Sequence, residues 1–118
     1  MWNMRGLLAL LPSGIAELLQ RLPPEILNRM TELRLRTGQP PAVTVGARTL
    51  FLSSEGTTVT AEKGLWIPQE TVQETLLSLC GHSLHGIEKT LDQGYFTAAG
   101  GFRVGVCMLP DAGRQGLG

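Results

Sequence analysis

The hydrophobic positions of the chain follow two spacings, one typical of helices and one typical of strands. Apolar residues three or four apart predict an amphipathic helix over residues 13–22, with Ser13 as its cap. Pro23 ends this helix, and Pro24 can begin a second short helix with Glu25 near its positive end. We therefore expect helical structure before the first strand.

Residues 31–36, TELRLR, alternate between polar and apolar side chains with the period of a strand. Leu33 and Leu35 then share the face that points to the core. The opposite face carries one acidic and two basic side chains, Glu32, Arg34 and Arg36. We expect Gly38 and the two prolines that follow it to end this strand.

Two other parts of the chain predict β-hairpins. Residues 42–45 and 48–52 form strands joined by a tight, glycine-containing turn. A second hairpin joins residues 95–97 to residues 102–109. Its second strand contains Arg103, and three apolar residues point away from that side chain: Phe102, Val104 and Val106.

Two helices are expected between the hairpins. The first begins at Pro68 and ends at Gly81. Its apolar side consists of Val72, Leu76, Leu77 and Leu79. The second covers residues 84–91 and is capped by Ser83.

The order of these elements predicts the fold class. Helices, strands, helices and strands follow one another, which suits a sheet with helices on one face. We expect an α+β fold with a mixed or antiparallel sheet of about five strands and helices packed on one face; residues 57–60 could add a brief pairing. A chain of 118 residues fits a single domain over residues 1–110, followed by a connector over residues 111–118.

The charge of the chain is balanced in total but uneven in kind. Lys+Arg and Asp+Glu number 10 each, so no global positive field draws the chain to nucleic acid or anionic lipid. Only six residues are Phe, Trp or Tyr, which leaves little for base stacking, and we expect no nucleic-acid partner. Because Lys63 and Lys89 are the two lysines, the other eight basic residues are arginines, whose planar fork suits fixed contacts to carboxylate or phosphate.

The cysteines and the N-terminus exclude further classes. Cys80 and Cys107 lack the spacing of a metal site, and we expect both to be reduced core residues of a cytosolic protein. The apolar run at residues 7–11 is too short to span a bilayer, which needs about 20 apolar residues. Residues 12–14 make a poor cleavage site, so we predict no signal peptide.

The sequence contains no motif that builds an active site. No Gly-Lys pair exists that could belong to a phosphate-binding P-loop. His82, His85 and Glu88 lie three residues apart, but no further ligands accompany them and the Ser83 cap leaves His82 outside the helix. We interpret the histidines as structural or solvent-exposed, and we expect neither catalytic residues nor a metal in the chain.

Three arginines remain as candidate site residues: Arg34, Arg36 and Arg103. The simpler interpretation is that they are solvated strand residues whose surface pairs contribute about 0–1 kcal/mol each. The other interpretation is that the row of guanidinium groups meets an anionic partner.

Two long segments carry a resemblance to a known family. ELRLRTGQP at residues 32–40 and GHSLHGIEKTLDQGYFTAAGGFRVGV at residues 81–106 resemble the N-terminal region of the stage III sporulation protein AA family. These proteins are secretion-type AAA+ ATPases of endospore-forming bacteria. The segment LPPEILNRM and the helix at residues 69–79 also fall in the expected order, so that the resemblance covers residues 10–118.

The resemblance implies that the chain is the N-terminal domain of a longer ATPase, as a fragment or a truncated gene product. In the family, a Gly-Arg-x-x-Gly-like segment leads into the P-loop ATPase domain, and here GRQGLG stands at that place. The Walker motifs are missing, so this chain should neither bind ATP tightly nor hydrolyse it unaided. ATP and Mg are implied for the full-length protein alone.

The family also implies partners and a location. Secretion ATPases form hexameric rings in which the N-terminal domain packs over the nucleotide site, so the full-length protein is expected to be a homo-oligomer. Arg34, Arg36 and Arg103 would then face nucleotide or an acidic patch of the ATPase domain. The expected partners are its own ATPase domain, neighbouring subunits and other components of a mother-cell to forespore channel, with the protein in the mother-cell cytoplasm or peripheral to the forespore membrane.

A different class of function stays open at this point. A stand-alone adaptor module without ATPase activity could use the same sheet surface for a protein partner. A Gly-Lys-Ser or Gly-Lys-Thr loop encoded in frame downstream would favour the ATPase, whereas a stop codon would favour the adaptor.

Overall fold

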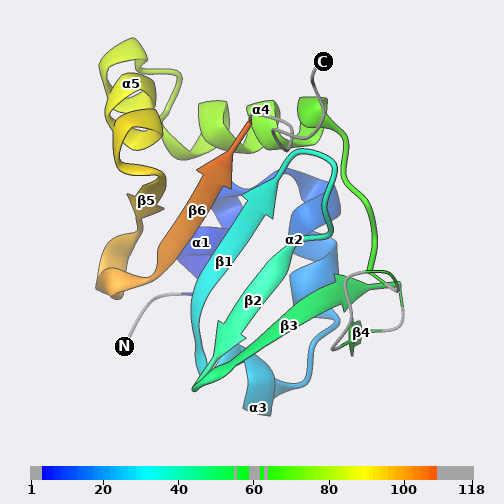
Figure 1. Ribbon diagram of the computed structural model, residues 1–118. Helices are drawn as coiled ribbons and strands as arrows, with labels where there is room; N and C mark the ends of the chain where they lie inside the picture. Colours follow the sequence, from blue (N-terminus) through cyan, green and yellow to red (C-terminus); the bar gives the residue numbers. More distant parts are fainter. Residues whose placement is uncertain (1–3, 55, 59–61, 63, 109–118) are drawn as a thin grey trace.

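A mixed β-sheet with helices on one of its faces makes up the computed structural model, which describes residues 4–54, 56–58, 62 and 64–108 (Figure 1). The helices are α1 (Met4–Leu10), α2 (Ser13–Gln20), α3 (Pro24–Leu27), α4 (Gln69–Leu79) and α5 (Leu84–Gln93), with a short 3-10 turn η2 (Ala99–Gly101). The strands are β1 (Met30–Arg36), β2 (Ala42–Val45), β3 (Arg48–Ser53), β4 (Gly56–Thr58), β5 (Tyr95–Thr97) and β6 (Arg103–Cys107). The predicted α+β class is confirmed, with six strands where about five were expected.

Strand β1 lies inside the sheet, whose strand order is β4-β3-β2-β1-β6-β5. It pairs antiparallel with β2 and parallel with β6, whereas the other neighbouring pairs are antiparallel. Leu33 is opposite Val43 on one side and Val104 on the other. Because partners across a sheet share a face, alternate residues of three strands build one continuous apolar surface.

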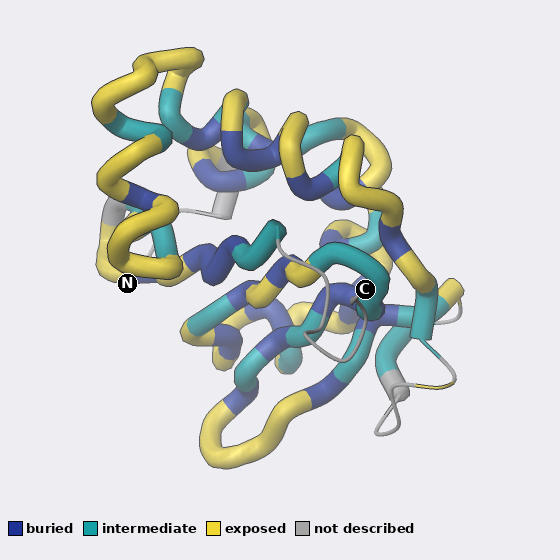
Figure 2. The backbone as a smooth tube through the Cα atoms, turned by 45° about the horizontal axis from the view of Figure 1, so that its top comes forward, coloured by how far each residue is buried: buried dark blue, intermediate teal, exposed yellow. Residues whose placement is uncertain are grey.

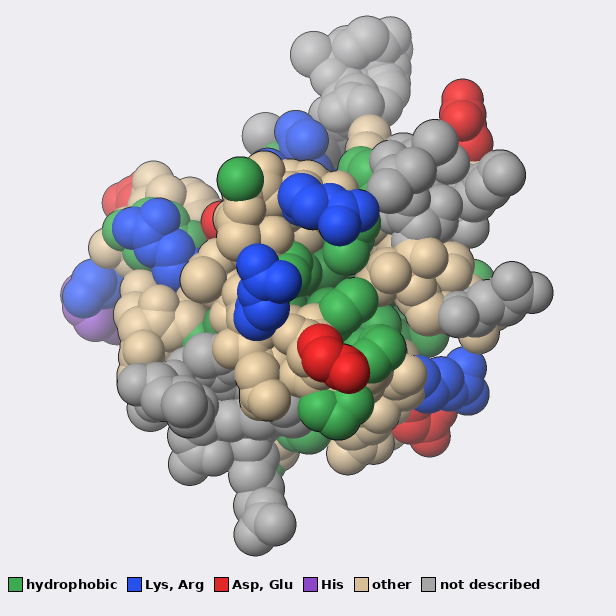
Figure 3. Space-filling model, turned by 90° about the horizontal axis from the view of Figure 1, so that it is seen from below, with side chains coloured by type: hydrophobic (Ala, Val, Ile, Leu, Met, Phe, Trp, Pro, Cys, Tyr) green, Lys and Arg blue, Asp and Glu red, His purple; other side chains and the backbone are tan. Residues whose placement is uncertain are grey.

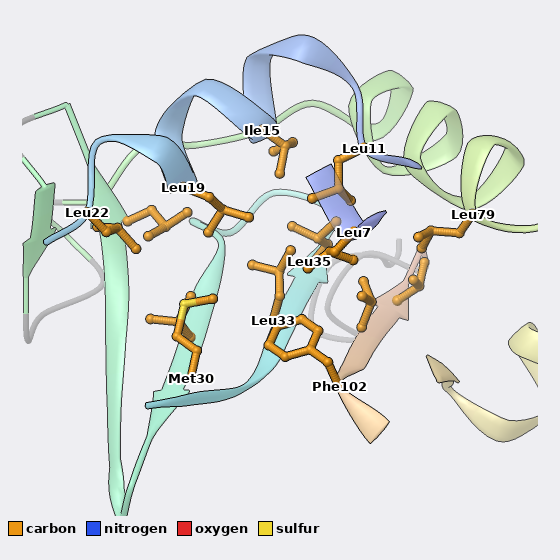
Figure 4. Packing of buried hydrophobic residues seen from close by; sticks show 14 of the residues in the cluster. Leu7, Leu11, Ile15, Leu19, Leu22, Met30, Leu33, Leu35, Leu79 and Phe102 are labelled. Carbon is orange, nitrogen blue, oxygen red and sulfur yellow. The ribbon is translucent and has the colours of Figure 1, made fainter. Parts of the chain in front are cut away.

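The core lies between this apolar surface and the helices. Leu33 and Leu35 are both 0% exposed, as the alternation in the sequence predicted. Helices α1, α2 and α4 cover them, and Figure 4 shows the side chains that meet from both layers: Leu7, Leu11, Ile15, Leu19, Met30, Leu33, Leu35, Leu79 and Phe102. Each fully buried side chain of this size stabilises the fold by about 1.5–3 kcal/mol.

Both predicted hairpins are present. Val45 pairs with Arg48, so Gly46 and Ala47 form a two-residue turn. Gly46 has a φ of 63°, a left-handed conformation that favours glycine. In the second hairpin, β5 pairs antiparallel with β6 and η2 forms part of the connection.

Helix α4 differs from its prediction at one position. Val72, Leu76 and Leu79 are buried, but Leu77 is 39% exposed, so its assignment to the apolar side was wrong. Thr75 takes that place in the buried stripe, and its hydroxyl donates a hydrogen bond of 2.7 Å to the Thr71 carbonyl. A threonine can be buried there because the preceding turn of the helix accepts from it.

The two predicted serine caps have different outcomes. The Ser83 side chain accepts from the Gly86 backbone N–H at 3.1 Å, which confirms it as the cap of α5. The Ser13 prediction was wrong, since Pro12 is the N-cap residue of α2 and makes no side-chain cap hydrogen bond. Ser13 is instead the first residue inside the helix.

The apolar N-terminal run and the cysteines have modest structural roles. Leu7 is a buried core residue of α1. Among the described helices, none has both the length and the apolar character needed to cross a membrane. Cys80 and Cys107 form no disulfide among the described residues, and they are half-buried rather than the core residues that were expected. The connector predicted at residues 111–118 lies outside the described residues.

Burial differs between the layers and the edges of the molecule. Figure 2 shows buried positions along the strands and on the inner side of the helices, whereas α5 and the tip of the β2–β3 hairpin carry many exposed positions. One face of the sheet is therefore covered by helices, and the near face of β1 and β6 in Figure 1 is left uncovered.

Candidate functional site

The uncovered face of β1, β5 and β6 carries the three arginines that the sequence singled out. Side chains opposite each other across paired strands point to the same side of the sheet. Glu32 is opposite Arg103, Arg34 is opposite Gly105, and Tyr95 is opposite Gly105 on the other side. We call this surface the arginine face and define it by Glu32, Arg34, Arg36, Tyr95, Arg103 and Gly105.

The parallel pairing of β1 with β6 explains why the arginines meet. Arg34 and Arg36 share a face because they are two residues apart on one strand. Arg103 is far away in the sequence, and it joins them because Glu32 and Arg103 are in register. The structure thus places all three on one surface, which alternation within each strand could not predict.

Arg34 forms the ion pair of this face. Its Nη2 lies 3.3 Å from Oε2 of Glu32, and the two side chains are 54% and 23% exposed. A pair this open to water contributes only about 0–1 kcal/mol to stability. Its main effect is therefore to orient the Arg34 guanidinium along β1, toward Glu32, rather than to hold the fold together.

Arg103 is oriented by an aromatic ring. Its guanidinium carbon lies 4.4 Å from the centroid of the Tyr95 ring, which is a cation–π contact. Such a contact is worth about 0.5–1 kcal/mol at an exposed site. The contact holds the Arg103 guanidinium beside the Tyr95 ring on the arginine face.

The local charge of the arginine face is positive although the whole chain is neutral. Arg36 is exposed and forms no ion pair with any residue that the structure describes. Three guanidinium groups share the face with the single carboxylate of Glu32. Figure 3 looks at the lower end of the molecule rather than onto this face, and it shows basic and acidic side chains with hydrophobic ones between them.

A hollow of about 810 Å³ lies on this face, and Arg34, Arg36, Leu91 and Gly105 are among the residues that line it. Its volume is within the range of about 300–1,000 Å³ that is usual for ligand sites. Gly105 keeps the floor low: a Cβ there would lie 3.4 Å from Glu32 Oε2 and 3.5 Å from Arg34 Cγ. A side chain at this position would fill the space between the ion pair and the Gly94 carbonyl oxygen, which would lie 3.7 Å from that Cβ.

Several residues of the hollow were missed by sequence reasoning. Tyr95 was recognised only as a strand residue, and Leu91 only as part of a helix. The sequence held no usable signal for Leu91, because what distinguishes this residue is its 47% exposure near the end of α5, and exposure is known only from the fold. For Gly105 the available signal was a glycine inside a predicted strand, which can mark a close approach of other groups, but the prediction did not use it.

The histidines lie away from this face. His82 and His85 are exposed, and His82 has a φ of 62° in the turn that joins α4 to α5. Within the described ranges, no group of three His, Cys, Asp or Glu residues could hold a metal ion.

The fold and the site together define a class: an α+β domain with a cationic, partly apolar hollow on the uncovered face of its sheet. The family model for sporulation stage III, protein AA matches residues 3–109, and the chain therefore belongs to this family. It is a sporulation stage III protein. A comparison with curated proteins finds no match, and a comparison with solved structures finds none either.

Proposed function

We propose that this chain acts as the N-terminal domain of a secretion-type sporulation ATPase, and that its arginine face packs on a P-loop ATPase domain. The observation that carries the proposal is the excess of guanidinium groups on this face, three to one carboxylate, beside an open hollow that Arg34 and Arg36 line. Membership of the sporulation family supports it. An anionic surface or ligand is the natural partner of such a face.

The proposed role of the arginines is electrostatic. The sequence has no P-loop, so the phosphate cradle and the Mg ion would belong to the other domain. Arg34, Arg36 and Arg103 would approach the phosphates of ATP or an acidic patch beside them. Guanidinium groups aimed at the charge that develops on a transferred phosphoryl group can accelerate the reaction by about 10³-fold or more.

The same proposal covers assembly and location. The full-length protein would form a hexameric homo-oligomer in the mother-cell cytoplasm, where neighbouring subunits complete the contacts of each N-terminal domain. Its ATPase activity would energise a channel from mother cell to forespore, built with other sporulation proteins at the membrane.

The test uses a full-length protein in which this domain precedes its ATPase domain. Changing Arg34→Ala and Arg36→Ala together should lower kcat for ATP hydrolysis at least about tenfold, because two cationic groups are removed from the nucleotide side. The control is Arg48→Ala. Arg48 is exposed and lies at the β2–β3 turn. It pairs with Val45, which pairs with Met30, so it lies near the end of β1 that is opposite to Arg36.

Circular dichroism should show the double variant to be folded, since both side chains are exposed. ATPase turnover equal to that of the Arg48→Ala control would contradict the proposed function. An unfolded double variant would show that the arginines are structural, which would also reject it.

A further inference from the structure

Opposite the arginines, the hollow has an apolar wall. Leu91 of α5 is 47% exposed and lines the hollow, as does Met108 after the end of β6. Helix α5 is attached to the body through Thr90, which is buried and whose Oγ1 lies 3.5 Å from the Cys80 sulfur. An occupant of the hollow therefore meets cations on β1 and a leucine on α5 at the same time.

The spacing of the arginines matches a helix. Arg34 and Arg36 are two positions apart on β1, a rise of about 6.6 Å. Side chains four residues apart on an α-helix are separated by a rise of about 6 Å and lie on one face. Two carboxylates at positions i and i+4 of a helix lying along β1 would therefore each reach one guanidinium.

An extended segment would match the spacing but not the site. Strand β1, which carries Arg34 and Arg36, is hydrogen-bonded to β2 and β6 on its two sides, so another strand could not pair with it. An extended chain in the hollow would leave its own backbone N–H and C=O groups without sheet partners. A helix satisfies these groups internally, and helices are the usual cover of a sheet face.

We propose that the hollow of the arginine face binds an acidic amphipathic helix of a partner, whose carboxylates four residues apart contact Arg34 and Arg36 and whose apolar side contacts Leu91. The proposal deepens the proposed function, and it rests on that function only in assigning the helix to the ATPase domain. Glu32 sets the position of the bound helix along β1, because a third carboxylate on the next turn of that helix would face the negative charge of Glu32.

The direct test is a titration of the 118-residue chain with a synthetic peptide, followed by fluorescence anisotropy. The probe is an alanine-rich helical peptide of about 18 residues, long enough to form a helix in water. It carries two glutamates four residues apart and leucines on the neighbouring face. Binding should saturate and weaken as salt is raised, because the contacting charges are near the surface.

Two control peptides isolate the chemistry of the probe. In one, glutamine replaces both glutamates, which removes the charge and keeps the shape. In the other, the glutamates are two residues apart, which places them on different sides of the helix. Both should bind about tenfold more weakly than the probe.

Protein variants identify the surface that binds. Arg34→Gln with Arg36→Gln should weaken binding of the probe about tenfold, and Leu91→Ser should weaken it about fivefold. Matched controls are Arg48→Gln, and Leu84→Ser on the same helix, where Leu84 is 71% exposed and does not line the hollow. These controls should change the affinity by less than about twofold.

The outcomes separate this inference from the proposed function. Absence of saturable binding, or equal losses in the control variants, overturns the helix site even if the arginines prove necessary for ATP hydrolysis. Specific binding of the probe supports the site even if the full-length ATPase tolerates both arginine substitutions, in which case only the proposed function fails.

Discussion

Neighbouring residues of β1 meet opposite surroundings. Leu35 is completely buried against the helices, while Arg34 and Arg36 on either side of it are exposed on the arginine face. Alternate side chains of β1 therefore belong to the core and to the candidate site. A substitution in this strand affects the core or the site, depending on which face its side chain is on.

Leu35→Asp should prevent folding. The change removes a buried leucine, which costs about 2–5 kcal/mol, and it places an unpaired carboxylate on the inward face. Thermal melting by circular dichroism is the measurement, and Thr31→Asp, at an exposed position of the same strand, is the control that should stay folded. An unchanged melting curve for Leu35→Asp would show that the strand faces are reversed.

At the scale of single elements, the two predicted serine caps behave differently. Ser83 closes the first turn of α5 with its hydroxyl, whereas α2 begins after Pro12 without a side-chain cap. Both serines precede a helical pattern of apolar residues, so the sequence alone does not show which of them caps its helix.

The difference predicts unequal effects of the same substitution. Ser83→Ala should lower the free energy of unfolding by about 1 kcal/mol, because the Gly86 N–H loses its acceptor. Ser13→Ala should change it by less than about 0.5 kcal/mol, since no cap hydrogen bond is lost. Urea denaturation of both variants measures this, and equal losses would refute the assigned caps.

Elements specified by local sequence were predictable. The alternation in β1, the tight turn after β2 and the apolar stripe of α4 each depend on residues close together in the chain. Leu77 was assigned wrongly because a leucine next to a stripe cannot be told from a leucine within it by hydrophobicity alone. The buried face of α4 instead includes Thr75, a polar residue whose hydroxyl donates a hydrogen bond to the Thr71 carbonyl within the helix.

At the scale of the whole molecule, the site depends on a pairing that local patterns do not contain. The sheet could be predicted as mixed or antiparallel, but not that β6 inserts beside β1 in parallel. The three arginines were identified from the sequence, whereas the approach of Arg103 to Tyr95 and of Leu91 to the hollow needs the tertiary register.

Because β6 is an internal strand, the second hairpin should be indispensable. A chain that ends at Gln93 would lose Phe102, Val104 and Val106, which complete the apolar surface beside Leu33. We expect no cooperative thermal transition for this truncation, measured by calorimetry against the complete 118-residue chain. A sharp transition of the truncated chain near the original midpoint would mean that the first three-quarters fold independently.

The register of β6 also decides where the polypeptide leaves the sheet. Cys107 is opposite Arg36, and Met108 lines the hollow directly after it. In a longer protein, whatever is joined after Met108 would therefore start beside the hollow that we propose as its docking surface. A short flexible tether imposes a local concentration in the millimolar range, so intramolecular docking could be stable with an intrinsic affinity too weak to recruit the same surface from free solution.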